Sequence, residues 1–330
     1  MNLDLLSCDW GTTSFRLRLV SGAERKIVRE IRESAGVKSL QDEALRRGAH
    51  GPLERGTVFE EYLRQKLDAL FANVPKPASP LPLIISGMAS SSIGWRELPY
   101  ARAPFALDGR GLLAEELRWN KPEWIGSTRL VSGVSTEHDM MRGEECEIIG
   151  LMSEPALAEF RERSLLILPG THCKHVWIDK GSVVNFRTYM TGELFEVMSK
   201  QSILRASVDP SALAGHYNES GRAAFMEGVL AAKENGLGAG LFQVRTRAVL
   251  GRRPLNENTW FLSGLLIGAE VVDISRVAME WPIVLAAARE LSEPYAVALR
   301  TLHTTSRWLQ LPPEAVENAV ISAHAMIASR

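Results

Sequence analysis

The sequence has no surplus of charge of one sign and no long hydrophobic run. Its 330 residues include 38 Lys and Arg against 39 Asp and Glu, a formal net charge of -1. Proteins that bind nucleic acid or anionic membranes usually carry a basic surplus, so we expect no nucleic-acid partner and no membrane partner. The most apolar stretch, residues 261–272, is too short to span a bilayer and contains Glu270.

Cysteine is scarce as well. Cys8, Cys146 and Cys173 are scattered along the chain, which fits a reducing compartment and no disulfide framework. The first four residues lack the basic flank of a secretory signal peptide. We therefore expect a cytoplasmic protein.

Two common phosphate-binding motifs are missing. The chain contains no Gly-Lys dipeptide, which excludes a Walker A loop. Gly236, Gly238 and Gly240 lack the spacing and the preceding strand of a dinucleotide fingerprint. A phosphate site in this protein must therefore be built from other turns.

The periodicity of apolar residues predicts an α/β fold, because short strand patterns alternate with amphipathic helices. Strands are expected at 3–8, 16–20, 26–31, 83–85, 130–134, 165–168, 174–178, 183–188 and 283–286. Helices are expected at 57–73, 143–152, 192–204, 222–233, 241–250, 256–273 and 313–328.

An internal near-repeat is the most informative feature of the chain. In each copy a buried strand leads into a Gly-Thr turn, an outgoing strand and a glycine turn. The distance from Gly11 to Gly22 is 11 positions, and the distance from Gly170 to Gly181 is also 11. This agreement predicts two similar halves; the alternative is a chance likeness of two hairpins.

A Gly-Thr turn suits phosphate, because it offers backbone N–H groups, a hydroxyl and room for close approach. Two such turns could hold one polyphosphate between two domains. Asp9 precedes the first turn and is the carboxylate that a bound Mg²⁺ would need. Lys174 follows the second turn and offers positive charge to phosphate oxygens.

Five motifs follow one another in a specific order. They are Asp9-Trp10-Gly11-Thr12-Thr13, Gly87-Met88 with Ser91 and Gly94-Trp95, Met141-Arg142-Gly143-Glu144-Glu145, Leu168-Pro169-Gly170-Thr171-His172, and Met190-Thr191-Gly192-Glu193-Leu194. Together they resemble the 2-dehydro-3-deoxygalactonokinases, also called 2-keto-3-deoxygalactonate kinases, of the sugar kinase/actin/heat-shock ATPase superfamily. The resemblance covers residues 4 to about 272. The first motif is shared across the superfamily, whereas the ordered set is specific.

The resemblance implies two ribonuclease-H-like (actin-like ATPase) domains, related by duplication, with an interdomain cleft. Domain one would comprise residues 1–157, joined by a C-terminal segment 298–330, and domain two residues 158–297. It implies transfer of the γ-phosphoryl group of ATP, with Mg²⁺, to the 6-hydroxyl of 2-dehydro-3-deoxy-D-galactonate in galactonate catabolism. ATP and the sugar acid would be the partners, and formation of a homodimer is left as an open alternative.

The resemblance also implies roles for individual residues. Gly11, Thr12, Thr13, Gly170, Thr171, His172 and Lys174 would bind phosphate, and Asp9 would face the metal. Glu144 is the first choice for the general base, with Glu145 and Asp139 as rivals. A structural alternative is that the two glutamates favour the positive end of a helix.

Six residues are expected near the sugar acid: Ser90, Ser91, Trp95, Arg142, Thr191 and Glu193. The serines follow a strand at the edge where open α/β sheets bind ligands. Trp95 would wall the sugar, and the planar guanidinium of Arg142 matches a carboxylate. Thr191 and Glu193 also fit an ordinary helix start.

The expected nucleotide side departs from the family pattern. No glycine occurs after Gly268, and Ala286-Ala287-Ala288 stands where the family usually has a glycine-bearing turn. Alanine disfavours positive φ and adds a Cβ where backbone should approach the nucleotide. Two alternatives therefore stay open: a kinase of another keto-deoxy sugar acid, and a catalytically degenerate ATP-binding regulator of the same fold.

Overall fold

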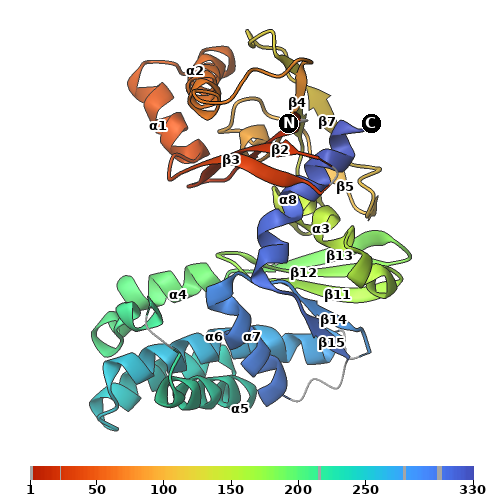
Figure 1. Ribbon diagram of the computed structural model, residues 1–330. Coiled ribbons are helices and arrows are strands. Elements are labelled where there is room, and N and C mark those ends of the chain that lie inside the picture. Colours follow the sequence, from red (N-terminus) through yellow and green to blue (C-terminus); the bar gives the residue numbers. More distant parts are fainter. Residues whose placement is uncertain (1–2, 23, 215–216, 278–279, 303–306) are drawn as a thin grey trace. The chain divides into compact units, whose positions relative to one another are not determined.

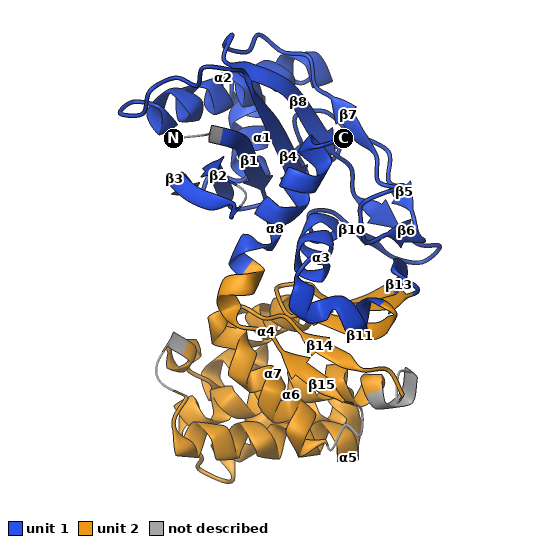
Figure 2. Cartoon of the chain, turned by 45° about the vertical axis from the view of Figure 1, so that its right-hand side comes forward, with its two compact units in different colours: residues 1–161, 180–185, 317–330 blue, residues 162–179, 186–316 orange. Residues whose placement is uncertain are grey.

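The computed structural model describes residues 3–22, 24–214, 217–277, 280–302 and 307–330 (Figure 1). The chain divides into two compact units (Figure 2). Unit 1 comprises residues 1–161, 180–185 and 317–330, and unit 2 comprises residues 162–179 and 186–316. No helix within the described ranges is both long and apolar enough to cross a membrane.

The residue bounds of the two units differ from those expected for the two domains at the C-terminal end of the chain. The chain returns to unit 1 at Glu317 and not at residue 298. The reason is a strand that the sequence patterns did not reveal: β15 (Trp308–Gln310) pairs in parallel with β14 (Ile283–Leu285) and so extends the sheet of unit 2.

Unit 1 is built on a mixed sheet with the strand order β3-β2-β1-β4-β8-β7. Its strands are β1 (Leu3–Trp10), β2 (Phe15–Ser21), β3 (Lys26–Glu33), β4 (Leu81–Gly87), β7 (Ala114–Glu116) and β8 (Ile125–Val131). The first three run antiparallel, and β1, β4 and β8 run parallel to one another. The strand expected at 130–134 is therefore β8, which begins and ends earlier.

The remaining elements of unit 1 are short strands and helices. They are α1 (Val37–Arg46), α2 (Pro52–Leu70), η1 (Met88–Ser90), β5 (Ala101–Arg102), β6 (Phe105–Ala106), β9 (Val134–Ser135), β10 (Met140–Met141), α3 (Glu144–Met152), η2 (Pro155–Arg161) and the end of α8 (Pro313–Ala328). Strands β5, β9 and β10 form a small sheet.

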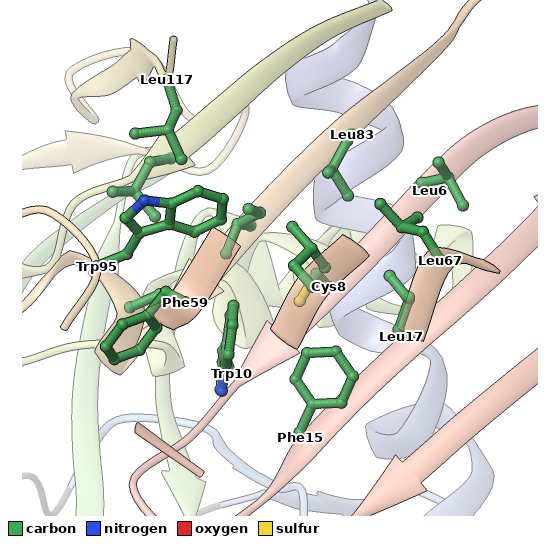
Figure 3. Close-up of a cluster of buried hydrophobic side chains, with 14 of the residues drawn as sticks. Leu6, Cys8, Trp10, Phe15, Leu17, Phe59, Leu67, Leu83, Trp95 and Leu117 are labelled. Carbon is green, nitrogen blue, oxygen red and sulfur yellow. The ribbon is translucent and has the colours of Figure 1, made fainter. Parts of the chain in front are cut away.

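Alternation along the strands gives the sheet of unit 1 two different faces. Leu6, Cys8 and Trp10 of β1 lie in an apolar core with α1 and α2 (Figure 3). On the opposite face the hydroxyl of Ser7 lies 2.8 Å from Nδ1 of His324 in α8. Asp9 points to this second face by the same alternation.

Unit 2 repeats the arrangement. Its sheet has the order β15-β14-β11-β12-β13, with β11 (Arg163–Leu168), β12 (Cys173–Asp179) and β13 (Ser182–Tyr189). Its helices are α4 (Thr191–Lys200), η3 (Ile203–Ser207), η4 (Pro210–Ala214), α5 (Glu219–Val249), α6 (Leu255–Val277) and α7 (Arg289–Thr301). Helices α5, α6 and α7 cover one face of the sheet (Figure 1). The start of β13 belongs to unit 1, where it pairs with β6.

The two sheets match strand for strand, since β3-β2-β1-β4-β8 corresponds to β13-β12-β11-β14-β15. The equivalent hairpin glycines share a left-handed conformation, with φ of 74° at Gly22 and 70° at Gly181. The interpretation of two related halves is thereby confirmed.

The sequence patterns did not predict two of the helices, and they predicted two separate helices where the structure has one. Helices α1 and α7 were not predicted; α7 contains Pro294, whose missing N–H argues against a helix interior. The helices expected at 222–233 and 241–250 form one run, α5, interrupted at Gly236 with φ 69° and ψ 172°.

Candidate active site

The motifs of unit 1 meet at the carboxyl ends of its parallel strands. Asp9 is paired with Ser86, and Trp10 with Gly87. Gly87 and Gly143 both adopt positive φ, 89° and 112°, and a Cβ on Gly143 would lie 3.4 Å from the Cα of Gly87. The start of α3 therefore lies directly against the end of β4.

Asp9 is a partly buried carboxylate with a charged environment. Its side chain is 24% exposed, and its Oδ2 lies 3.9 Å from Nη1 of Arg16. Burial raises the pKa of Asp9, the nearby guanidinium of Arg16 opposes this, and the negative charge of Glu144 adds to it. Two carboxylates thus lie near one another at the end of β1.

This pair suits a hard divalent cation, because carboxylate oxygens are the ligands that Mg²⁺ prefers. Within the described ranges no group of three or more His, Cys, Asp and Glu side chains could hold a metal ion. An Mg²⁺ at Asp9 would therefore take most of its ligands from water and phosphate, as it commonly does.

The first Gly-Thr turn is held by backbone hydrogen bonds. The N–H of Gly11 donates to the carbonyl of Ser14 at 2.9 Å. The N–H groups of Val37 and Lys38, at the start of α1, donate to the carbonyls of Gly11 and Thr12 at 2.9 and 3.1 Å. Thr12 and Thr13 remain exposed. The turn is thus fixed by its carbonyls and leaves both hydroxyls accessible.

The three candidate bases lie in different environments. Glu145 is fully buried and accepts the N–H of Gly143 at 2.7 Å; burial, together with the charge of Glu144, raises its pKa to about 8. A carboxyl with no exposed surface is not accessible to a substrate hydroxyl. Glu144 and Asp139 are both partly exposed and accept backbone N–H groups, from Arg142 at 3.0 Å and from Met140 at 2.7 Å.

Arg142 and Ser90 bind each other. Nη1 of Arg142 donates to the carbonyl of Ser90 at 2.6 Å and to its hydroxyl at 2.5 Å. Its guanidinium carbon lies 4.2 Å from the ring centre of Tyr100. The guanidinium that was expected to meet a substrate carboxylate is instead occupied in holding the loop after β4.

Ser91 and Trp95 are also directed inward. The hydroxyl of Ser91 donates to the carbonyl of Met88 at 2.7 Å, and the side chain of Trp95 is only 6% exposed. Trp95 packs edge-to-face on Trp10, with ring centres 6.4 Å apart. It therefore belongs to the core of unit 1 (Figure 3) and does not offer an open face to a sugar.

The second Gly-Thr turn follows β11 in unit 2. A Cβ on Gly170 would meet nothing within 4 Å, and its φ is not positive. Packing therefore does not require glycine here, and the space above the turn stays open. A Cβ on Gly192 would lie 2.6 Å from the carbonyl oxygen of Gly170, so α4 begins directly on the turn.

The charged groups expected at this turn do gather there. Nε2 of His172 lies 2.5 Å from Oε2 of Glu193, and both side chains are about half exposed. The N–H of Glu193 donates to the carbonyl of Thr171 at 3.1 Å. Nζ of Lys174 lies 3.4 Å from the carbonyl of His172, which brings an ammonium group to the turn.

Beneath this turn lies a buried polar network that sequence reasoning missed. Its centre is Glu270 of α6, 2% exposed. Glu270 accepts hydrogen bonds from the hydroxyls of Thr191 at 2.5 Å and Tyr295 at 2.8 Å, and its Oε1 lies 2.7 Å from Nε2 of His175. Thr191 therefore faces the interior. The available signal was one acidic residue inside the apolar stretch 261–272, since a buried charge needs partners.

An apolar recess of about 110 Å³ opens beside the turn within unit 2. It is lined by Gly170, by the start of α4, and by side chains of α6 and α7 that include Leu266, Leu291 and Tyr295. Residues 286–288 lead from β14 into α7, and none of them has positive φ. The backbone there does not require the glycine that the family pattern usually has.

Comparison with known proteins identifies the family of this chain. The sequence profile described as 2-keto-3-deoxy-galactonokinase matches residues 9–323. The chain belongs to this family. It is 32% identical over 309 residues to the 2-dehydro-3-deoxygalactonokinase of Escherichia coli strain K12, covering 92% of this chain and 91% of that protein.

A Rhizobium meliloti relative named as a 2-dehydro-3-deoxygalactonokinase is 32% identical over 269 residues, 80% of this kinase and 78% of the relative. A crystal structure from Sinorhizobium meliloti, assigned to the same activity, has a TM-score of 0.76 at 28% identity and covers 97% of this chain and 98% of its own. The family resemblance, the two-half α/β fold and the assignment as a phosphotransferase are thereby confirmed.

Proposed function

We propose that this kinase transfers the γ-phosphoryl group of ATP to the 6-hydroxyl of 2-dehydro-3-deoxy-D-galactonate, with Mg²⁺. The observation that carries the proposal is the family match over residues 9–323, in which all five motifs fall. Phosphoryl transfer depends mainly on positioning and charge neutralisation. The motifs provide glycine turns and carboxylates for these tasks, and Lys174 follows the fourth motif by two positions.

In unit 1, Gly11, Thr12 and Thr13 would contact phosphate, and Asp9 would hold Mg²⁺. The exposed threonines and the partly exposed carboxylate support these roles. When bound, Mg²⁺ neutralises charge on the phosphoryl group being transferred. Glu144 would accept the proton of the attacking hydroxyl, because it is partly exposed and electrostatically coupled to Asp9.

In unit 2, Gly170, Thr171, His172 and Lys174 would contact the phosphates of ATP, and the apolar recess beside Gly170 would receive its nucleoside. The sugar acid would lie against the loop that follows β4, which Arg142 holds in place through Ser90. Arg142, Thr191 and the serines would thus act by shaping the site.

The direct test is release of ADP in a coupled assay with Mg-ATP and 2-dehydro-3-deoxy-galactonate, with the gluconate epimer in parallel. We expect turnover with a higher kcat/KM for the galactonate form. Preference for the epimer would favour a kinase of another keto-deoxy sugar acid. Absence of turnover with both acids in folded protein would favour the degenerate regulator.

A further inference from the structure

We propose that Glu270 is a positioning residue for the nucleotide: it is a buried acceptor that holds the second Gly-Thr turn and the start of α4 in their binding geometry. The inference rests on the proposed function, in that it takes ATP as the ligand of this turn. It assigns to Glu270, Tyr295 and Cys173 a role that the motifs did not indicate.

The network joins four elements that are far apart in the sequence. His175 and Cys173 come from β12, Thr191 from the first residue of α4, Glu270 from α6 and Tyr295 from α7. All five side chains are at most 8% exposed. A carboxylate buried this deeply is costly unless several donors satisfy it, and three groups converge on this one.

The direction of the bond between Tyr295 and Glu270 is clear, whereas the Cys173 thiol has two acceptors. Burial raises the pKa of Tyr295 far above its usual range and the pKa of Cys173 to about 11, so both keep their protons. The Tyr295 hydroxyl donates to Oε2 of Glu270 at 2.8 Å. Sγ of Cys173 lies 2.9 Å from the Tyr295 oxygen and 3.3 Å from the carbonyl of Gly170, and its single thiol proton can be donated to either oxygen.

Two paths lead from this carboxylate to the turn. Along the first, Tyr295 contacts Cys173, whose Sγ accepts the N–H of Gly170 at 3.5 Å. Along the second, Thr191 fixes the start of α4, where Gly192 abuts the Gly170 carbonyl. Backbone hydrogen bonds support this turn less than its counterpart in unit 1: α4 gives it one, from the N–H of Glu193 to the carbonyl of Thr171, whereas α1 gives the first turn two. Among the described residues, the side chains around Glu270 supply its buried polar support.

The test removes one hydroxyl. Tyr295→Phe keeps the ring that lines the recess and breaks the link between Cys173 and Glu270. We expect the Kd for Mg-ADP, measured by titration calorimetry, and the KM for ATP to rise about tenfold, since the broken link leaves a buried polar group without its partner. The KM for the sugar acid should change less than about twofold, and kcat at saturating ATP should be largely kept.

Thr301→Val is the matched control. Thr301 is also on α7, and its hydroxyl donates to the carbonyl of Val297 at 2.8 Å, away from the network. This variant should lose a similar amount of thermal stability without a change in nucleotide affinity. If the network had only a structural role, the two variants would have the same Kd for Mg-ADP.

Glu270→Gln gives a second, conservative test. Its amide oxygen can still accept from Thr191 and Tyr295, while its NH₂ faces His175. Nδ1 of His175 has no hydrogen-bond partner among the described residues, so it can take the ring proton and leave Nε2 to accept. Glu270→Gln should therefore bind Mg-ADP nearly normally, whereas Glu270→Leu should not.

The outcomes separate the two proposals. If the unaltered protein turns over and binds Mg-ADP while Tyr295→Phe and Thr301→Val bind it equally well, the role of Glu270 is wrong and the kinase function stands. If the unaltered, folded protein binds no nucleotide, the proposed function fails and this inference fails with it.

Discussion

The two Gly-Thr turns occupy equivalent places in the two units but carry different chemistry. Two positions before the glycine, unit 1 has Asp9, which is partly exposed, and unit 2 has the buried Leu168. Four positions after it, both residues are buried, but unit 1 has the apolar Phe15 and unit 2 has Lys174, which is 4% exposed. One copy therefore carries the acid and the other the cation.

The turns also differ in what holds them. The carbonyls of the first turn are bonded to N–H groups of α1, and backbone hydrogen bonds of this kind do not depend on side-chain identity. The second turn receives one such bond, from the N–H of Glu193 in α4 to the carbonyl of Thr171, and depends otherwise on packing against Gly192 and on the side chains around Glu270. Substitutions away from the turn should therefore disturb the second turn more than the first.

The largest effect is expected where the two turns differ in charge. Asp9→Asn should lower kcat by about 1,000-fold, since a catalytic metal contributes several kcal/mol to transition-state stabilisation. Coupled ADP release at saturating Mg-ATP measures this, and circular dichroism checks the fold. An unchanged rate in folded protein would remove Asp9 from the metal site.

The next effect separates the candidate bases. Glu144→Gln should lower kcat by about 100-fold or more while changing the KM for the sugar acid little. Asp139→Asn, made in parallel, should retain most of the activity. If the two variants behave the other way round, the base is Asp139.

Two glycine substitutions at the second turn should have different effects, because one glycine faces open space and the other is closely packed. Gly170→Ala should leave the melting temperature unchanged and weaken ATP binding about tenfold, because its Cβ would enter the space above the turn. Gly192→Ala should instead destabilise the fold by about 1–3 kcal/mol, because its Cβ would lie 2.6 Å from a backbone carbonyl. Thermal melts and the KM for ATP distinguish the two; equal melting temperatures would contradict the packing argument.

The smallest effect concerns Glu145, the buried glutamate of unit 1. Its folded-state pKa of about 8 lies above its ordinary value of 4.5, so the folded state keeps a proton that the unfolded state releases. Stability should therefore fall as pH rises from about 4.5 to about 8. Glu145→Gln should flatten this loss, so that its melting temperature exceeds that of the unaltered protein more at pH 8 than at pH 5. A pH-independent difference would show that Glu145 is not protonated in the fold.

The two buried glutamates show which features of the site could not be predicted from the sequence. Glu145 was a candidate base because it lies in a motif, and only its burial removes it from contact with substrate. Glu270 was not considered, because it lies in no motif and its partners His175 and Thr191 are 95 and 79 residues away. Hydrogen bonds over such separations leave no periodic signal in a sequence.

The sequence by itself determined the family, the α/β class, the internal repeat and the places of both turns. Those features depend on local spacing: alternation in strands, glycine at tight turns, and the order of motifs. Only the tertiary structure decided which side chains are buried and which polar groups are hydrogen-bonded within the protein. It placed Trp95 in the core, bound Arg142 to Ser90, added β15 to the second sheet and assembled the Glu270 network. Burial and hydrogen-bond partners are set by elements that meet only after folding.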